Sequence, residues 1–241
     1  MSVELVQGDA LSLLAALENE SVDRVITDPP YGETSLTWDR APRDWLKEIR
    51  RVLKRTGSAW VFGSLKSHIA TDWSGWNVAQ DVVWEKHNGS NAAKDRFRRV
   101  HELAVHVYRS DAQWREVYNR PLYTNDARAK VVRRKQRPPQ WGDIGSAVYV
   151  SEDGGPRLAR SVMFHRSCHG FAQHPTQKPV EVIAPLIEVS CPPGGLVLDP
   201  FAGSGTTLIA ARELGRRALG FELKPEYAAV ANSRILISEF W

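Results

Sequence analysis

The 241-residue sequence predicts an α/β fold built on a mostly parallel, doubly wound sheet. Short apolar runs of strand length alternate with segments of helical spacing at both ends of the chain, which is the pattern of strand–helix–strand units. The composition, 42% hydrophobic and 25% charged, is that of an ordinary globular protein. It excludes a fibrous repeat, a disordered chain and a disulfide scaffold.

The first part of the chain supplies three strands and two helices. We expect strands at residues 2–6, 21–27 and 58–62, and helices at 11–17 and 44–53. The second strand stops at two consecutive prolines, because neither can donate a hydrogen bond to a sheet ladder. In the second helix, apolar residues recur at helical spacing and form one face.

The middle of the chain is strongly basic. Strands are expected at 81–84 and 102–108, after which periodicity fades between residues 111 and 166. Residues 86–170 contain 17 Lys and Arg against 8 Asp and Glu, whereas the rest of the chain is net acidic. This distribution predicts a polyanion-binding segment carried on a separate scaffold.

Regular order resumes in the last third. The sequence predicts helices at 180–190, 206–214 and 225–237, separated by strands at 196–198 and 218–221. Strand and helix alternate here as they do at the start, so both ends of the chain are expected to contribute to the sheet.

A glycine-rich turn follows the strand at 196–198. The strand ends in Asp199, and residues 200–205 lead into a helix that begins at Thr206. Glycines let the backbone approach a ligand, and free N–H groups at the helix start favour an anion. The next strand ends in Glu222, whose carboxylate can accept hydrogen bonds from two ribose hydroxyls.

This turn lacks two features of phosphate sites. It has neither the third glycine of a dinucleotide-binding turn nor the lysine of a phosphate-binding loop. The pattern therefore predicts a nucleoside ligand that needs no phosphate, and S-adenosylmethionine fits. A plain tight turn is the alternative interpretation.

A second motif, Asp28-Pro29-Pro30-Tyr31, stands at the carboxyl end of the strand at 21–27. An exocyclic amine on a nucleobase is a poor nucleophile, because its lone pair is delocalised into the ring. A carboxylate and a main-chain carbonyl can accept its two N–H bonds, and the prolines fix the direction of the Pro29 carbonyl. Tyr31 offers a ring face on which a base can stack. A Pro-rich strand exit with a solvated Asp is the alternative.

The two motifs together resemble those of the amino-methyltransferases that methylate DNA bases at an exocyclic nitrogen. The catalytic motif precedes the cofactor motif and a basic insert separates them, which is the order of the beta class. The resemblance implies a Rossmann-like, S-adenosylmethionine-dependent methyltransferase fold with permuted motif order. Further segments that resemble motifs of this family are residues 7–9, 83–86, 101–102, 174–179 and 220–223.

The resemblance also implies roles for individual residues. Asp28 and the Pro29 carbonyl would hold the target amine, with Pro30 part of the same motif, and Tyr31 would stack on the extruded base. Thr176 and Lys178 would support the methionine carboxylate of the cofactor. The other residues expected in the cofactor site are Asp9, Asp199, Phe201, Gly203, Gly205, Thr206 and Glu222.

The resemblance divides the chain into three parts. Residues 1–110 would form the catalytic half of the methyltransferase domain, 111–166 a basic target-recognition insert, and 167–241 the cofactor-binding half. Phosphate contacts position such a protein on DNA, and a solvated charged loop is the alternative interpretation. The candidate phosphate contacts in the insert are Arg133, Arg134, Lys135 and Arg137.

The implied activity is site-specific methylation of the N6 amine of adenine in double-stranded DNA, within a restriction-modification system or as a solitary methylase. The target base must leave the stack, because its amine is otherwise tied in a base pair. The alternatives are N4-cytosine methylation, RNA as the substrate, and a DNA-binding module that has lost activity. In the family, Asp at the first motif position leans towards adenine and Ser towards cytosine.

No metal site and no membrane span are expected. His165, Cys168, His169 and His174 have irregular spacing for metal ligands. The start of the chain has no basic residues followed by an apolar core, and no apolar run reaches spanning length. Two cysteines suit the reducing cytoplasm of a bacterial, archaeal or phage-infected cell. A homodimer is compatible with the resemblance, because relatives often pair.

Overall fold

A computed structural model of the chain describes residues 2–33, 39–40, 42–89, 94–134, 147–170 and 172–237. The chain forms two compact units. The larger contains residues 1–120 and 161–241, and the smaller contains residues 121–160.

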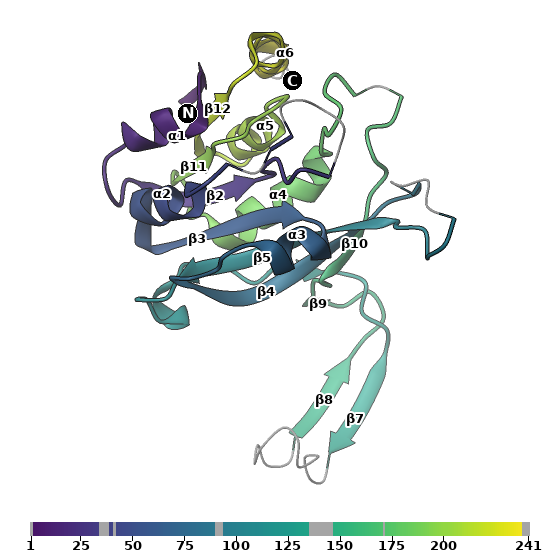
Figure 1. Cartoon of the computed structure of the whole chain (residues 1–241). Coiled ribbons are helices and arrows are strands. Elements are labelled where there is room, and N and C mark those ends of the chain that lie inside the picture. Colours follow the sequence, from purple (N-terminus) through teal and green to yellow (C-terminus); the bar gives the residue numbers. More distant parts are fainter. Residues whose placement is uncertain are drawn as a thin grey trace. The chain divides into compact units, whose positions relative to one another are not determined.

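The larger unit is built on an eight-stranded sheet (Figure 1). In spatial order its strands are β1 (Val3–Gln7), β12 (Arg217–Glu222), β11 (Leu196–Asp199), β2 (Val22–Thr27), β3 (Leu53–Gly63), β5 (His101–Arg109), β4 (Trp76–Glu85) and β10 (Val162–Phe164). The first five are parallel, β5 is antiparallel to β3 and β4, and β10 is parallel to β4. The prediction of a mostly parallel α/β sheet is confirmed.

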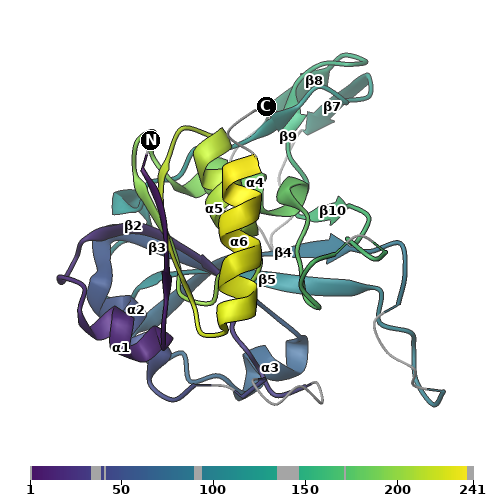
Figure 2. The ribbon, with the colours of Figure 1, turned by 90° about the horizontal axis from the view of Figure 1, so that it is seen from above.

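Helices cover both faces of this sheet. Val25 and Ala59 belong to one apolar core, and their strand neighbours Ile26 and Trp60 belong to another, because alternate residues of a strand face opposite ways. The first core includes residues of α1 and α2, and the second includes residues of α4, α5 and α6 (Figure 2). The helices are α1 (Ala10–Ala15), α2 (Trp45–Val52), α3 (Leu65–Ala70), α4 (Val180–Ser190), α5 (Thr206–Glu213) and α6 (Pro225–Ile237).

Several elements differ from the sequence prediction: β4 begins at Trp76 rather than at residue 81, the strands between residues 123 and 164 (β6 to β10) were not predicted, and two further differences lie between residues 53 and 70. Strand β3 begins at Leu53, directly after α2, and a register shift beside Val22 absorbs the residues before Ser58. Helix α3 was not predicted, because its six residues are too few to show a helical period, and only His68 among them is buried. The side chain of Ser64 accepts a hydrogen bond from the Ser67 N–H and thereby caps this short helix.

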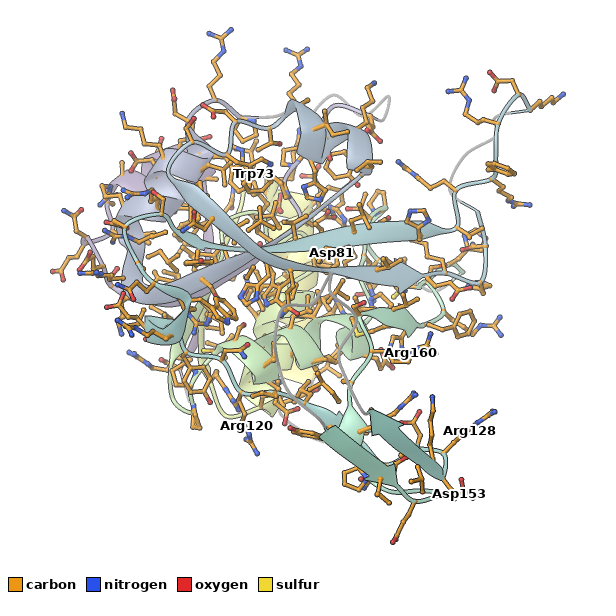
Figure 3. All side chains as sticks on the ribbon, turned by 90° about the horizontal axis from the view of Figure 1, so that it is seen from below. Trp73, Asp81, Arg120, Arg128, Asp153 and Arg160 are labelled. Atoms are coloured by element: carbon orange, nitrogen blue, oxygen red, sulfur yellow. The ribbon has the colours of Figure 1, made fainter. Side chains whose placement is uncertain are left out.

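The smaller unit consists of two antiparallel strand pairs, β6 (Tyr123–Thr124) with β9 (Arg157–Leu158) and β7 (Lys130–Arg134) with β8 (Ala147–Ser151). Next to the β7–β8 pair, the Asp153 carboxylate accepts a hydrogen bond from the Ala129 N–H at 2.7 Å. Arg128 and Asp153, labelled in Figure 3, mark this end of the β7–β8 pair.

This unit is narrower than the predicted insert of residues 111–166. Residues up to Arg120 belong to the larger unit, because buried Arg24 donates to the Tyr118 carbonyl at 2.7 Å. The Arg120 N–H in turn donates to the Val189 carbonyl of α4 at 2.7 Å. Residues from 161 onwards return to the sheet through β10. Within the described ranges, no helix combines the length and apolarity that a membrane crossing requires.

Candidate active site

The two sequence motifs meet because β2 and β11 are neighbours in the sheet. They run parallel, with Leu198 paired with Val25, so Asp28 and Asp199 stand at the same edge. Thr27, the last residue of β2, donates from its hydroxyl to the Asp199 carboxylate at 3.0 Å. The chain leaves β2 towards β3 and leaves β11 towards β12. Such a switch point is where open α/β sheets bind their ligands.

A cavity of about 190 Å³ lies at this edge. Most of the predicted site residues line it. Those that do so are Asp9, Asp28, Pro30, Thr176, Lys178, Asp199, Phe201, Gly203, Thr206 and Glu222. Pro29 is buried, Tyr31 is half-buried and Gly205 immediately precedes α5; these three are not part of the wall.

The glycine-rich turn between β11 and α5 needs glycine for steric reasons. Gly203 and Gly205 have φ values of +51° and +76°, a region that side chains disfavour. A Cβ at Gly205 would lie 3.1 Å from the Cβ of Ala231, and one at Gly203 would lie 3.4 Å from the His174 ring. No side chain caps α5, so the N–H groups of its first turn remain available beside the cavity.

Glu222 ends β12 on the other side of this turn. One carboxylate oxygen accepts the Gly203 N–H at 2.9 Å, and the other accepts the Lys224 N–H at 2.8 Å. These bonds fix the carboxylate, while each oxygen keeps a further lone pair for a ligand hydroxyl. Burial raises the pKa of Glu222. Asp9 serves two purposes, because it lines the cavity and also caps α1 by accepting the Ser12 N–H at 2.9 Å.

Asp199 is buried and still accepts several hydrogen bonds. Its Oδ1 receives the Thr27 hydroxyl and the Phe201 N–H, the latter at 3.1 Å. Burial raises the pKa of Asp199 to about 6, and the hydrogen bonds from Thr207, Phe201 and Thr27 only partly oppose this rise. The carboxylate is therefore ionised at neutral pH and becomes protonated in mild acid.

Asp28 belongs to a buried cluster of four charges. Its Oδ2 lies 2.5 Å from Lys178 Nζ, which lies 3.1 Å from Glu102 Oε2. Lys86 also pairs with Glu102. Burial raises the pKa of Asp28, and the positive charge of Lys178 opposes this rise. Burial alone would lower the pKa of Lys178, but the carboxylates of Asp28 and Glu102 raise it overall, so the ammonium stays charged.

The second oxygen of Asp28, Oδ1, is buried without a hydrogen-bond partner among the described residues. An unsatisfied buried acceptor costs about 1–3 kcal/mol, so a native fold rarely keeps one without a use. Because Asp28 lines the cavity, this oxygen is suited to accept a hydrogen bond from a ligand. Lys178 holds the opposite oxygen and restricts rotation of the carboxylate.

The sequence predicts a cofactor role for Lys178, and this residue does line the cavity, with its ammonium between Asp28 and Glu102. Thr27, Glu102 and Lys86 received no individual role, although each touches a carboxylate of the site. The usable signal for Glu102 was the antiparallel pairing of β4 and β5, which sets it opposite Trp84 near Lys86.

The predicted phosphate contacts lie outside this cavity. Arg133 and Arg134 belong to β7 of the smaller unit, whereas Lys135 and Arg137 fall outside the described residues.

Tyr31 carries a neutral phenol. The negative charge of Asp28, followed by burial, raises the pKa of Tyr31. In the described part of the chain, no three His, Cys, Asp or Glu side chains gather in a way that could hold a metal ion.

Residues 22–233 match the model of a protein family described as DNA methylase, whose members are N6 and N4 methyltransferases. The chain belongs to the N6/N4 DNA methylase family. The resemblance predicted from the two motifs is therefore confirmed, and the protein is a DNA methyltransferase.

Two relatives of similar sequence are also methyltransferases by name. The chain is 29% identical over 262 residues to the Type II methyltransferase M2.LlaDCHI of Lactococcus lactis subsp. cremoris, covering 96% of this chain and 88% of that one. It is 28% identical, with the same coverage, to the Type II methyltransferase M2.DpnII of Streptococcus pneumoniae.

Solved structures of DNA methylases show the same fold. A complex of M1.HpyAVI with SAM aligns with a TM-score of 0.64 and 25% identity, covering 96% of this chain and 99% of that one. The cytosine-N4-specific PvuII DNA methyltransferase aligns with a TM-score of 0.67 and 19% identity, covering 97% and 86%. The Rossmann-like methyltransferase fold is thereby confirmed.

Proposed function

We propose that this DNA methyltransferase transfers the methyl group of S-adenosylmethionine to the N6 amine of adenine in double-stranded DNA. The observation that carries the proposal is the unpartnered Oδ1 of Asp28, which shares one cavity with Asp199 and Glu222. A buried acceptor beside a nucleoside-type site is what an exocyclic amine needs. Adenine is preferred to cytosine because the motif begins with Asp rather than Ser.

The residues around the cavity fit the cofactor. The Glu222 carboxylate is fixed by two backbone N–H groups and can accept hydrogen bonds from the ribose hydroxyls. Asp199 is an anion suited to the ammonium group, and Phe201 adds apolar surface to the wall. When bound, the cofactor supplies an electrophilic methyl group on its sulfonium.

The catalytic motif would hold the target amine and its base, and it would not bind the cofactor. Asp28 Oδ1 and the Pro29 carbonyl accept its two N–H bonds and favour a pyramidal nitrogen whose lone pair can attack. Tyr31 stacks on the extruded base. Transfer would be direct and in line, with no covalent intermediate on the enzyme: the nitrogen–methyl bond would form as the sulfur–methyl bond breaks, S-adenosylhomocysteine would leave, and the amine would release one proton to solvent. Orientation supplies much of the rate enhancement, since positioning two reactants contributes several kcal/mol.

The smaller unit is proposed to contact the DNA. Arg133 and Arg134, on adjacent positions of β7, would meet phosphates, and Lys135 and Arg137 continue the same basic run. Such contacts position a protein without specifying sequence, so base contacts elsewhere must select the site.

The proposal is tested by incubating the protein with methyl-tritiated S-adenosylmethionine and plasmid DNA, then digesting the DNA to nucleosides. We expect label in N6-methyldeoxyadenosine, identified by mass. Label in N4-methyldeoxycytidine would overturn the adenine assignment, and label in RNA alone would overturn the choice of DNA. Base-resolution methylation mapping of a host that expresses the protein then gives the recognition site.

Cofactor binding is expected to weaken in mild acid. The pKa of Asp199 is raised to about 6, so the carboxylate that pairs with the ammonium group becomes protonated below that pH. The Kd for S-adenosylmethionine should rise by about tenfold for each pH unit below 6. Isothermal titration calorimetry from pH 8 to pH 5 measures this dependence.

Two controls assign the pH effect to Asp199. Asp199→Asn should bind weakly at every pH, with a flat profile. A slope that persists in this variant would assign the titration to Glu222 instead. The free energy of unfolding has the opposite sign: a raised folded-state pKa favours the folded protein in acid, and this contribution is lost as pH rises through about 6.

Lys178→Met is expected to shift the acid limb of the rate profile to higher pH. Without the ammonium, only the weaker effect of Lys86 opposes burial and the pKa of Asp28 rises further, so more protein carries a protonated Asp28 near neutrality. Breaking the buried ion pairs should also lower the free energy of unfolding by about 3 kcal/mol. Methyl-transfer rates from pH 5 to pH 9 and thermal unfolding measure the two effects.

Lys178→Arg is the matched variant, because it retains the charge beside Asp28. It should restore most of the pH profile. If Lys178→Met loses stability but keeps the wild-type profile, Lys178 has a structural role only.

A further inference from the structure

The loop between β4 and β5 carries an apolar side chain that the fold does not use. Phe97 is 98% exposed, the largest value among the described large hydrophobic residues. Burial of a phenylalanine side chain stabilises a fold, so leaving this ring in water gives up that contribution to the free energy of unfolding. Figure 2 shows this connection extending beyond the ends of β4 and β5.

The residues beside Phe97 are mostly cationic. Lys94, Arg96 and Arg98 are exposed, and the only acidic residue among positions 94–99 is Asp95. Asp95 pairs with Arg96 at 2.6 Å. An exposed aromatic ring among cations matches a nucleic acid, whose phosphates attract the charges while its bases can receive the ring.

Both ends of the loop are tied to the catalytic motif. The Lys86 N–H donates to the Val100 carbonyl at 2.7 Å and closes the base of the loop. Lys86 is also part of the buried charge cluster that reaches Asp28. On the other side, Arg99 lies 3.2 Å from Glu33, two residues after Tyr31. The loop therefore begins and ends beside the residues that would hold the target base.

We propose that residues 94–99 form a DNA-contacting finger, in which Phe97 enters the base stack at the position that the target nucleotide leaves. Lys94, Arg96 and Arg98 would contact the flanking phosphates. The proposal rests on the proposed function and deepens it. Extruding a base from the duplex loses its stacking and pairing, and an inserted apolar ring offsets part of that loss.

The test compares Phe97→Ala with the wild type on two DNAs that contain the mapped site. In the first the target adenine is paired in a duplex, and in the second the same strand is single. The variant should lose about 10- to 100-fold in kcat/KM on the duplex, since one stacking contact is worth about 1–3 kcal/mol. On the single strand, where no base has to leave a helix, it should stay within about twofold of the wild type.

A fluorescent readout follows extrusion directly. With 2-aminopurine in place of the target adenine, the wild type should raise the fluorescence of the duplex, and Phe97→Ala should raise it much less. Phe97→Trp should retain both the methyl transfer on duplex DNA and the rise in 2-aminopurine fluorescence, because it keeps an aromatic ring. Ile69→Ala is the matched control, since Ile69 is an apolar side chain on α3 that is 77% exposed.

Equal losses on duplex and single strand would overturn the finger, because they would assign Phe97 to folding or to the active site. Equal transfer by wild type and variant on both DNAs would also overturn it while leaving the proposed function intact. Failure of the wild type to methylate adenine in either DNA would overturn the proposed function and this inference with it.

Discussion

Asp28→Ala is expected to lower the rate of methyl transfer at saturating substrate by about 1,000-fold, the range seen when a group that acts on the reacting atoms is removed. The physical reason is the loss of Oδ1, the buried acceptor that would hold the target amine. The Kd for S-adenosylmethionine should change little, because the residues that fit the cofactor belong to other elements. Tritium transfer and calorimetry measure the two quantities.

The same substitution removes one partner of a buried ion pair. Lys178 would keep only Glu102 as a counter-ion, so we expect the free energy of unfolding to fall by about 3 kcal/mol. Asp28→Asn is the control for volume. Its amide oxygen would turn towards Lys178 and leave an NH₂ group facing the amine, so this variant should also lose about 100-fold. Wild-type label incorporation by folded Asp28→Ala would remove Asp28 from the mechanism.

The sequence predicted the sheet well because its strands obey simple rules. In the second half of β3, the consecutive residues 59–62 are all apolar and buried on opposite faces of the sheet, so this part of the strand appears in the sequence as a continuous apolar run. Helix α3 was not found, because six residues are too few to show a helical period and its apolar Leu65 and Ile69 are exposed. The smaller unit is shorter than the predicted insert, since the bonds from Arg24 to Tyr118 and from Arg120 to Val189 join residues up to 120 to the larger unit, and no local sequence pattern encodes such contacts.

The site was predictable where a motif combines with a strand end. Asp28 and Asp199 each follow an apolar strand, and parallel strands bring their carboxyl ends to one edge. The pairing of Lys178 with Asp28 was not predictable, because periodicity cannot tell which of several nearby carboxylates a lysine meets. Glu102 lies in a segment that resembles a family motif but received no role of its own, because a charged residue is usually exposed, whereas only 12% of this side chain is exposed.

Glu222→Ala is expected to weaken S-adenosylmethionine binding by about 100-fold. Two hydrogen bonds from ribose hydroxyls to a charged acceptor are together worth about 3 kcal/mol, and both would be lost. The variant also leaves the Gly203 and Lys224 N–H groups without their acceptor, which loosens the glycine-rich turn. Isothermal titration calorimetry gives the Kd. Glu226→Ala, which removes an exposed carboxylate from the first turn of α6, should bind as the wild type does.

Steady-state kinetics separate the roles of Glu222 and Asp28. If Glu222 acts only on cofactor binding, Glu222→Ala should show a raised KM for S-adenosylmethionine and recover most of its kcat at saturation. Asp28→Ala should show the reverse, a low kcat that no cofactor concentration restores, because its missing group would act on the amine. A Glu222→Ala variant with normal KM and reduced kcat would move this carboxylate from the cofactor to the chemical step. That result would mean that the carboxyl end of β12 does not bind the cofactor ribose.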